Sequence, residues 1–585
     1  MAEIIIMPKL GFNMSVGKLV EWYKQEGDTV AKGENLFSIE TDKTNMDIEA
    51  TADGVVRKLF IGEGDTLPVT LPIAIVGSAD EDISSLLAEA QAQLGDHASG
   101  DSAEGGVPAP APAPADKTDD GAAAASGDSG FDYDIAVLGG GPGGYVAAIK
   151  AAQMGKKVVI VEKERLGGTC LNIGCVPTKA LLKSAEVFHE LSSAESFGVE
   201  SLDTSKAELN LEKVQARKKT IIDQLVGGVG ILLESNGAVL KNGEGALTDK
   251  NTIEVNGEKI TADNIIIATG SVAKGLPITI SDKMEVMTST EALDIDKKPE
   301  SIAIIGGGVI GMEFAYLLHC LGTKVTVIEF LDRIMPMVDE EITQEVTERL
   351  ISEGMEIYTS AQVTEITADG VIFEKDGNTE EVKVEKVLMA VGRAPSLTGV
   401  DTEALGIKTE KGAIVTDNQL RTSVPNIYAI GDANGKIMLA HTASAEGLVA
   451  VETICGKKAS MDYDKIPSAI YIQPEIASVG LTEADAKAKY GTIKVGRFPM
   501  FGNGKAKVEG DERGLIKVIT EAKYGEIVGV HMYCNRATDM IAETTLAMKL
   551  EATAEEVAGT VHPHPTVSEA VQEAMHAIGG RAIHF

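Results

Sequence analysis

The chain has 585 residues, which is too long for a single hydrophobic core and predicts several domains. Its net charge of −35, from 88 acidic and 53 basic residues, argues against nucleic acids and acidic membrane surfaces as partners. No apolar run approaches the roughly 18 residues of a membrane span, the amino terminus resembles no export signal, and five cysteines make no secreted disulfide framework, so we expect a soluble cytoplasmic protein.

Residues 1–77 contain short β-type segments separated by Gly-Asp turns, which predicts a small all-β domain. Two of its segments, VEWYKQEGDTV and VRKLFIGEGDTL, resemble each other, as expected for a domain of two similar halves. Lys43 in IETDKTNMDIEA falls at a predicted hairpin tip, where an isolated lysine is usually only an exposed charge. Residues 78–130 are rich in Ala, Pro, Gly and Ser without apolar periodicity, which predicts a flexible linker.

Two βαβ units follow the linker, DYDIAVLGGGPGGYVAAIKAAQMGKKVVIVEKE and ESIAIIGGGVIGMEFAYLLHCLGTKVTVIEF. Each places a G-x-G-x-x-G turn between a strand and a helix, where the glycines allow a tight turn, approach of a pyrophosphate and close helix packing. In each unit an acid 18 residues past the last glycine can accept hydrogen bonds from ribose hydroxyls. The expected dinucleotide ligands are Gly139, Gly141, Gly144 and Glu162 in the first unit, and Gly306, Gly308, Gly311 and Glu329 in the second.

One bare glycine motif is a weak signal, but two copies in the same strand and helix context indicate two bound dinucleotides. Glu329 is followed by FLDR, with no arginine directly after it to receive a 2′-phosphate. This favours NAD over NADP at the second unit.

Two cysteines, Cys170 and Cys175, are separated by four residues in GGTCLNIGCVPTKA. They could be packing residues or metal ligands, although no second Cys/His cluster with finger-like spacing supports zinc. They could also form a redox pair, because the segment opens a predicted helix whose dipole favours a thiolate. We expect Cys320, Cys455 and Cys534, which match no catalytic motif, to be packing or surface residues.

The segment GGTCLNIGCVPTKALL resembles the redox-disulfide signature of the two-dinucleotide flavoprotein disulfide reductases, and specifically that of the dihydrolipoyl dehydrogenases. The resemblance covers residues 131–585 and includes IIIATGS, AVGRAPS, IYAIGDAN and HPHPTVSEA. It implies FAD on the first glycine loop and NAD on the second, in an α/β fold of two Rossmann-like domains and an α+β dimer-interface domain. The implied boundaries are 131–273 for the FAD domain, 274–397 for the NAD domain, 398–467 for a central domain and 468–585 for the interface domain.

The same resemblance implies residue roles. Cys175 should face the flavin while Cys170 exchanges with substrate. Lys179 and Glu313, the latter in the NAD-type unit, should form an ion pair beside the flavin, which Gly270 and Asp432 should also contact.

A thiol attacks a disulfide as the thiolate, so the reaction needs a base oriented by a carboxylate. His564 and Glu569 match the family pattern H-P-x-x-S-E, in which this pair completes the active site of the other subunit of a homodimer. Alone, the HPHP segment could equally be a solvated loop. His562 lies in the same segment and stays unassigned.

The segment around Lys43 resembles the lipoyl domains of 2-oxo acid and acetoin dehydrogenase complexes, with biotin as the lesser option because Asp42 and Thr44 replace the usual methionines. The implied activity is reoxidation of protein-bound dihydrolipoamide with reduction of NAD⁺. The implied partners are an acyltransferase core and other subunits of such a complex. The alternatives are another FAD-dependent disulfide reductase, running from NADPH, or a carrier subunit that mainly assembles a complex.

Overall fold

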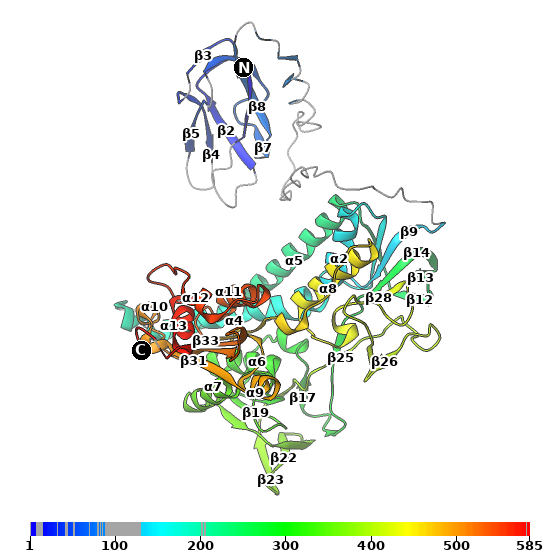
Figure 1. The fold of residues 1–585 in the computed structure, drawn as a ribbon, viewed down its shortest axis with the longest axis vertical. Coiled ribbons are helices and arrows are strands. Elements are labelled where there is room, and N and C mark those ends of the chain that lie inside the picture. The colour runs from blue at the N-terminus through cyan, green and yellow to red at the C-terminus, as the bar shows by residue number, and fades with distance from the viewer. Residues whose placement is uncertain are drawn as a thin grey trace. The chain divides into compact units, whose positions relative to one another are not determined.

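The computed structural model describes residues 2–7, 16–31, 33–40, 45–50, 53–68, 71–78, 130–200, 206–580 and 582–585, with single positions at 81, 83, 84, 86, 87, 90 and 203. The chain forms two compact units, Met1–Asp120 and Gly121–Phe585, each of which is described by itself (Figure 1). Within the described part of the chain, no helix is long and apolar enough to cross a bilayer.

The first unit contains two four-stranded antiparallel sheets. One sheet has the order β1 (Glu3–Ile6), β8 (Pro72–Gly77), β6 (Gly54–Leu59) and β3 (Thr29–Val30). The other has the order β5 (Asn45–Glu49), β4 (Asn35–Glu40), β2 (Val16–Trp22) and β7 (Thr66–Pro68). Their shared core is built from alternating apolar residues such as Leu19, Phe37 and Ile73, which agrees with the predicted small all-β domain.

The two Gly-Asp turns of this unit are hydrogen-bonded to each other's strands. In the first turn, the Gly27 amide donates to the Val56 carbonyl at 2.8 Å, and the Val56 amide donates to the Asp28 carbonyl at 2.9 Å. In the second turn, the Gly64 amide donates to the Leu19 carbonyl at 2.7 Å, and the Leu19 amide donates to the Asp65 carbonyl at 2.9 Å. This reciprocal pattern matches the expected internal repeat. Strands β4 and β5 pair with Glu40 opposite Asn45, and the predicted tip residue Lys43 lies outside the described residues.

The second unit begins with a seven-stranded sheet around β9 (Tyr133–Leu138). Its order is β11 (Val239–Asn242), β10 (Val158–Glu162), β9, β14 (Glu258–Ile267), β13 (Thr252–Val255) and β12 (Gly245–Asp249), with β28 (Ile427–Ala429) paired to β14. The strands from β11 to β14, and β28, run parallel, and β10 is a continuous buried run as a covered parallel strand requires. Helices α2 (Pro142–Gln153) and α8 (Ala440–Ile454) lie side by side, and α5 (Leu211–Ser235) contacts α2 (Figure 1).

A second, five-stranded parallel sheet carries the second glycine loop. Its order is β17 (Glu285–Met287), β24 (Lys386–Met389), β18 (Ser301–Ile305), β19 (Lys324–Ile328) and β20 (Glu356–Tyr358). Helix α6 (Val309–Cys320) follows β18, and α7 (Glu340–Ser352) precedes β20. A smaller sheet comprises β16 (Thr279–Ile280), β21 (Gln362–Ile366), β22 (Gly370–Lys375) and β23 (Asn378–Lys383).

The carboxyl-terminal part contains a five-stranded antiparallel sheet. Its order is β29 (Ser468–Ile470), β30 (Glu475–Gly480), β33 (Ile527–Cys534), β32 (Leu515–Glu521) and β31 (Ile493–Pro499). Helix α13 (Glu569–Ile578) packs on β31 and β32 through an apolar face that includes Val571 and Ala574. The other helices here are α9 (Glu483–Tyr490), α10 (Gly504–Glu509), α11 (Ala537–Lys549) and α12 (Ala554–Ala558).

Short elements connect these layers. They are α3 (Gly168–Ile173), α4 (Cys175–Glu190), the strands β15 (Ser271–Ala273), β25 (Arg393–Pro395), β26 (Thr409–Glu410) and β27 (Ala413–Ile414), and the 3-10 turns η2 (Leu191–Phe197), η4 (Glu291–Asp294), η5 (Gly431–Asn434), η6 (Tyr463–Lys465) and η7 (Met500–Gly502). The predicted α/β class, with two nucleotide-type sheets and an α+β part, is confirmed. The exact domain boundaries stay a prediction. Because β28 joins the first sheet, the segment 398–467 returns to the layer that 131–273 begins.

Candidate active site

Both glycine loops open into one cavity of about 1770 Å³ in the second unit. Residues of the first loop (139–141) and of the second (306 and 308) line it, as do both cysteines of the predicted pair. The predicted residues Lys179, Gly270, Glu313 and Asp432 line it as well. The structure therefore gathers predicted site residues as far apart in sequence as Gly139 and Asp432 around a single space.

The two glycine loops have the same construction. A Cβ at Gly144 would lie 1.9 Å from the carbonyl oxygen of Gly139, and a Cβ at Gly311 would lie 2.0 Å from that of Gly306. At Gly308, by contrast, a Cβ would meet nothing within 4 Å, so the backbone at the start of α6 is open to the cavity. Free helix amides beside an open backbone fit the pyrophosphate of a dinucleotide.

The acids that end the second strands hold the glycine loops. The Glu162 carboxylate accepts hydrogen bonds from the Gly140 amide at 2.6 Å and the Glu164 amide at 2.8 Å. Glu329 accepts equivalent bonds from the Gly307 amide at 2.6 Å and the Leu331 amide at 2.7 Å. Sequence reasoning expected only ribose contacts from these acids, but each also anchors its own loop. A carboxylate has lone pairs left for ribose hydroxyls, so both roles are compatible.

The cysteine pair lies at a helix start. Cys170 is in α3, and Cys175 is the first residue of α4 and is exposed to the cavity. A hydrogen bond from the Cys170 thiol lowers the pKa of Cys175 to about 7, against the effect of burial and with further help from Lys179. The same contact raises the pKa of the Cys170 thiol. When the pair loses one proton, the negative charge therefore lies on Cys175, and the Cys170 thiol donates a hydrogen bond to it.

The predicted ion pair between Lys179 and Glu313 is present. Lys179 Nζ lies 2.9 and 2.8 Å from the two carboxylate oxygens of Glu313 and 4.6 Å from the centre of the Tyr471 ring. The Tyr471 amide also donates to Glu313 at 3.1 Å. Because the lysine is on α4 and the glutamate on α6, the pair joins the helix of the cysteines to the helix of the second glycine loop.

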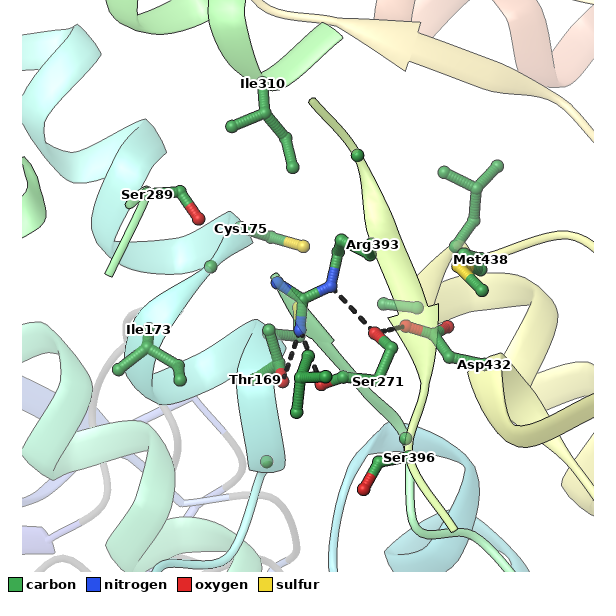
Figure 2. A pocket seen from close by; sticks show the side chains of 18 of the residues that line it. Thr169, Ile173, Cys175, Ser271, Ser289, Ile310, Arg393, Ser396, Asp432 and Met438 are labelled. Atoms are coloured by element: carbon green, nitrogen blue, oxygen red, sulfur yellow. Dashed lines mark hydrogen bonds between the residues drawn. The ribbon is translucent and has the colours of Figure 1, made fainter. Parts of the chain in front are cut away.

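A second polar group, formed by Ser271, Arg393 and Asp432, lines the cavity near Cys175 (Figure 2). The Ser271 hydroxyl donates to Asp432, and it accepts a hydrogen bond from Arg393 Nε at 2.7 Å. Arg393 Nη2 also donates to the Ser271 carbonyl at 2.7 Å. Burial lowers the pKa of Arg393, and the charges of Asp432 and Cys175 oppose this shift.

Arg393 and His441 are among the cavity residues that sequence reasoning missed. Arg393 belongs to AVGRAPS, so the motif itself was the available signal. His441 lines the cavity too, with Nε2 at 2.8 Å from the Pro467 carbonyl, and no pattern in the sequence marks it.

The predicted contact between His564 and Glu569 is present but lies away from the cavity of this chain. His564 Nδ1 is 2.8 Å from Glu569 Oε1, and the other oxygen of Glu569 accepts from the Thr566 amide at 2.8 Å. Burial alone would raise the pKa of Glu569, but the Thr566 amide and His564 hold it below its usual value. The His564 side chain is 78% exposed, and it does not line the cavity of this chain.

His562, which had no assignment, is buried and bonded to Glu543 at 2.9 Å and to the Thr560 carbonyl at 3.0 Å. Cys320 and Cys534 are buried in apolar clusters and Cys455 is half-buried, as expected for packing residues. Burial raises the pKa of Cys320 to about 11. Among the described residues, no group of three or more metal-binding side chains gathers.

Comparison with known proteins gives three family matches. Residues 133–447 match the family described as pyridine nucleotide-disulphide oxidoreductase, residues 466–575 its dimerisation domain, and residues 3–76 the family described as biotin-requiring enzyme. A dihydrolipoyl dehydrogenase of Bacillus subtilis is 45% identical over 474 residues, covering 78% of this chain and 99% of that protein. A dihydrolipoyl dehydrogenase of Thermus scotoductus is 42% identical over 464 residues, covering 77% and 99%.

Among solved structures, the HOCl-induced flavoprotein disulfide reductase RclA from Escherichia coli matches with a TM-score of 0.67 at 26% identity. The match covers 76% of this chain and 99% of that one.

Proposed function

The chain belongs to the pyridine nucleotide-disulphide oxidoreductase family, and its similarity to dihydrolipoyl dehydrogenases supports that activity. We propose that Cys170 and Cys175 form the redox disulfide of this activity. The single observation that carries the assignment is the lowered pKa of Cys175 at the start of α4, inside the cavity that both glycine loops share. A structural cysteine pair needs neither a stabilised thiolate nor a dinucleotide cavity.

The cofactors of this family are FAD and NAD. When bound, FAD would supply an acceptor for the electron pair of a thiolate, and NAD⁺ would supply an acceptor for the hydride. We assign Gly139, Gly141, Gly144, Glu162, Lys179, Gly270 and Asp432 to FAD, and Gly306, Gly308, Gly311, Glu313 and Glu329 to NAD. Support comes from the open backbone of the glycine loops and from the place of these residues around one cavity.

The chemistry of the chain itself is thiol–disulfide exchange. One thiol of dihydrolipoamide, deprotonated by His564, attacks the Cys170 sulfur of the oxidised pair, so the Cys170–Cys175 bond breaks and Cys175 leaves as a thiolate. The second substrate thiol then attacks its neighbour in the mixed disulfide, which releases oxidised lipoamide and the Cys170 thiol. Lys179 stabilises the Cys175 thiolate, and Glu569 orients the imidazole of His564.

We assign lipoate to Lys43 in the amino-terminal domain, on a linker over 78–130. The chain carries a dimerisation domain and a lipoyl-type domain, which fits a homodimer that works within a 2-oxo acid dehydrogenase complex. An acyltransferase core, in a 2-oxo acid or acetoin complex of the cytoplasm, is the partner that such a carrier domain would visit. Tethering raises the local concentration of the lipoyl group at each site it can reach. The division at 131–273, 274–397, 398–467 and 468–585 remains part of this proposal.

An anaerobic titration of the purified flavoprotein tests the activity. Dihydrolipoamide should produce the long-wavelength absorbance of a thiolate beside flavin, and NAD⁺ should restore the oxidised spectrum. Cys170→Ser should remove the response to dihydrolipoamide, whereas Cys455→Ser, a half-buried cysteine away from the pair, should keep it. A flavin that ignores dihydrolipoamide and is bleached by NADPH would move the chain to another branch of the family.

Mixed dimers test whether His564 serves the site of its partner subunit. Co-expression of Cys175→Ser with His564→Ala chains should restore about a quarter of the wild-type sites, because half of the dimers are mixed and each has one complete site. If His564 acted within its own chain, the mixture would stay inactive. Each variant expressed alone is the control.

A further inference from the structure

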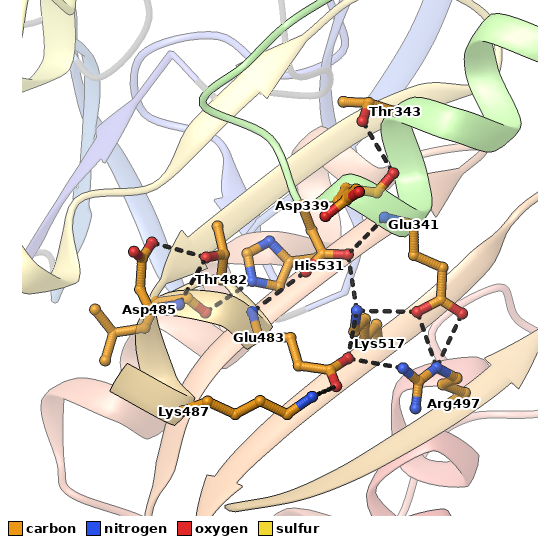
Figure 3. A network of polar contacts seen from close by, with 12 residues as sticks. Asp339, Glu341, Thr343, Thr482, Glu483, Asp485, Lys487, Arg497, Lys517 and His531 are labelled. Atoms are coloured by element: carbon orange, nitrogen blue, oxygen red, sulfur yellow. Dashed lines mark hydrogen bonds and ion pairs between the residues drawn. The ribbon is translucent and has the colours of Figure 1, made fainter. Parts of the chain in front are cut away.

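A network of charges around one buried ion pair joins the sheet of the carboxyl-terminal part to helix α7 of the second glycine-loop unit (Figure 3). Its centre is Lys517 on β32, whose side chain is only 3% exposed. Lys517 Nζ lies 2.8 Å from Asp339, 2.9 Å from Glu341 and 2.8 Å from Glu483. Asp339 and Glu341 belong to the start of α7, so the contact crosses between the two layers.

The network is balanced in charge. Arg497 bonds to both Glu341 and Glu483, and Lys487 bonds to Glu483, so three cations face three carboxylates. A buried lysine is costly unless carboxylates surround it, and here the carboxylates hold the pKa of Lys517 above its usual value in spite of burial. Such a group keeps one geometry, because any displacement leaves a buried charge unpaired.

Asp339 connects this network to the segment before α7. Its carboxylate caps the helix by accepting from the Glu341 amide at 3.2 Å, while the same oxygen accepts from Lys517. Asp339 is itself 2% exposed and follows directly on residues 330–338, which we call the NAD loop. The position of Lys517 therefore fixes the carboxyl end of that loop.

The NAD loop is bonded to the second glycine loop through the amide of Met335. The Met335 amide donates to the Gly307 carbonyl at 2.8 Å, and the Val338 amide donates back to Met335 at 2.9 Å. Ile334, Met335 and Val338 are buried beneath it. Its remaining apolar side chains point outward and line the cavity near the glycines: Phe330 is 67% exposed and Met337 is 86% exposed.

We propose that Lys517 is a positioning residue for the nicotinamide dinucleotide, acting from the neighbouring layer through Asp339 on the NAD loop. The contacts run from Lys517 to Asp339, along the loop to Met335, and from Met335 to Gly307. Phe330 and Met337 offer an apolar surface to the adenosine end of the dinucleotide. Loss of the lysine should leave the cysteine pair untouched and loosen only the surface that receives NAD. This inference rests on the proposed function.

The test uses the full-length flavoprotein with Lys517→Met. We expect the KM for NAD⁺ to rise by about tenfold, while the rate of flavin reduction by dihydrolipoamide stays within about twofold. Amide hydrogen exchange should become faster in peptides covering 330–338 and unchanged in those covering 168–180. Lys517→Arg should restore most of the NAD⁺ affinity, because a cation of similar reach returns to the three carboxylates.

Lys383→Met is the matched control, since it removes an exposed lysine paired with Asp369 on the hairpin of β22 and β23. If Lys517→Met does not fold, Asp339→Asn provides the same test, because asparagine keeps the helix cap through Oδ1 and loses the charge pair together with the weaker bond from the Glu483 amide at 3.3 Å. Unchanged NAD⁺ affinity and unchanged exchange at 330–338 would overturn the inference, as would equal losses in both half-reactions. Failure of dihydrolipoamide to reduce the wild-type flavin would instead overturn the proposed function.

Discussion

The two glycine-loop units hold their loops with the same hydrogen bonds, but the segments that follow the loops differ. In each unit the middle glycine of the loop, Gly140 or Gly307, makes two backbone hydrogen bonds. Its amide donates to the carboxylate at the end of the second strand, Glu162 or Glu329, and its carbonyl accepts from an amide of a later segment. In the first unit that donor is Gly167, three residues before Cys170, at 2.8 Å. In the second it is Met335, in the NAD loop, also at 2.8 Å.

The difference teaches that the nucleotide fold supplies only a fixed loop, and the segment attached to it decides the role. Behind the first loop, the chain continues into Cys170 and Cys175, the proposed redox pair. Behind the second, it continues into the capped helix that Lys517 holds. Substitutions that act on one unit alone can separate these roles.

Cys175→Ser should have the largest effect. It removes the thiolate and should lower turnover of dihydrolipoamide with NAD⁺ by at least about a thousandfold. Because the second unit is unchanged, binding of NADH measured by fluorescence should stay at the wild-type level. Turnover above a tenth of the wild-type rate would exclude Cys175 from the redox pair.

Gly144→Ala and Gly311→Ala make the same steric change in the two units, since either Cβ would overlap a loop carbonyl. Overpacking of this kind costs about 1–3 kcal/mol. We expect Gly144→Ala to be purified with less bound FAD, and Gly311→Ala to keep its FAD but show a raised KM for NAD⁺. Flavin content by absorbance and steady-state kinetics measure the two outcomes, and loss of flavin in Gly311→Ala would reverse the assignment.

Glu162→Gln and Glu329→Gln should have smaller effects. Glutamine keeps one acceptor oxygen but turns an NH₂ toward the second backbone amide, at a cost of about 1–3 kcal/mol for the unmatched donor. Glu329→Gln should weaken NAD⁺ binding about tenfold, with flavin content intact. Glu162→Gln should speed the release of FAD in dilute guanidinium chloride. Equal behaviour of the two variants would mean that the loops do not serve separate dinucleotides.

The smallest expected effect is a shift in a titration. The thiolate of Cys175 is the charged form, so it dominates above its pKa of about 7 and is lost as the pH falls through that value. The long-wavelength band of the reduced enzyme should follow this curve. Lys179→Met, which removes a nearby cation, should move the midpoint upward by about one pH unit. Lys183→Met, an exposed lysine on the same helix, is the control and should leave the midpoint in place.

Local patterns in the sequence predicted which strands and helices carry the glycine loops and the two cysteines, because each pattern depends on residues that are neighbours in the chain. The pair of Lys179 and Glu313, which are 134 residues apart, followed only from the family resemblance. Lys517 and Asp339, 178 residues apart, were not predicted at all. Their contact depends on how two layers pack, and a buried lysine in a strand has no sequence signature.

The histidines show the same limit. His562 and His564 are two residues apart with similar neighbours, yet one is buried against Glu543 and the other is exposed. Only the course of the backbone decides which ring reaches solvent. The family pattern H-P-x-x-S-E selected His564 and Glu569, and it offered nothing to place His562.

The reciprocal Gly-Asp turns of the amino-terminal unit have a consequence for how that unit opens. Each turn is completed by hydrogen bonds from the other half, so neither half can come apart while the other remains folded. Opening is therefore all-or-none, and a protease that needs a loosened turn must wait for the whole unit to unfold.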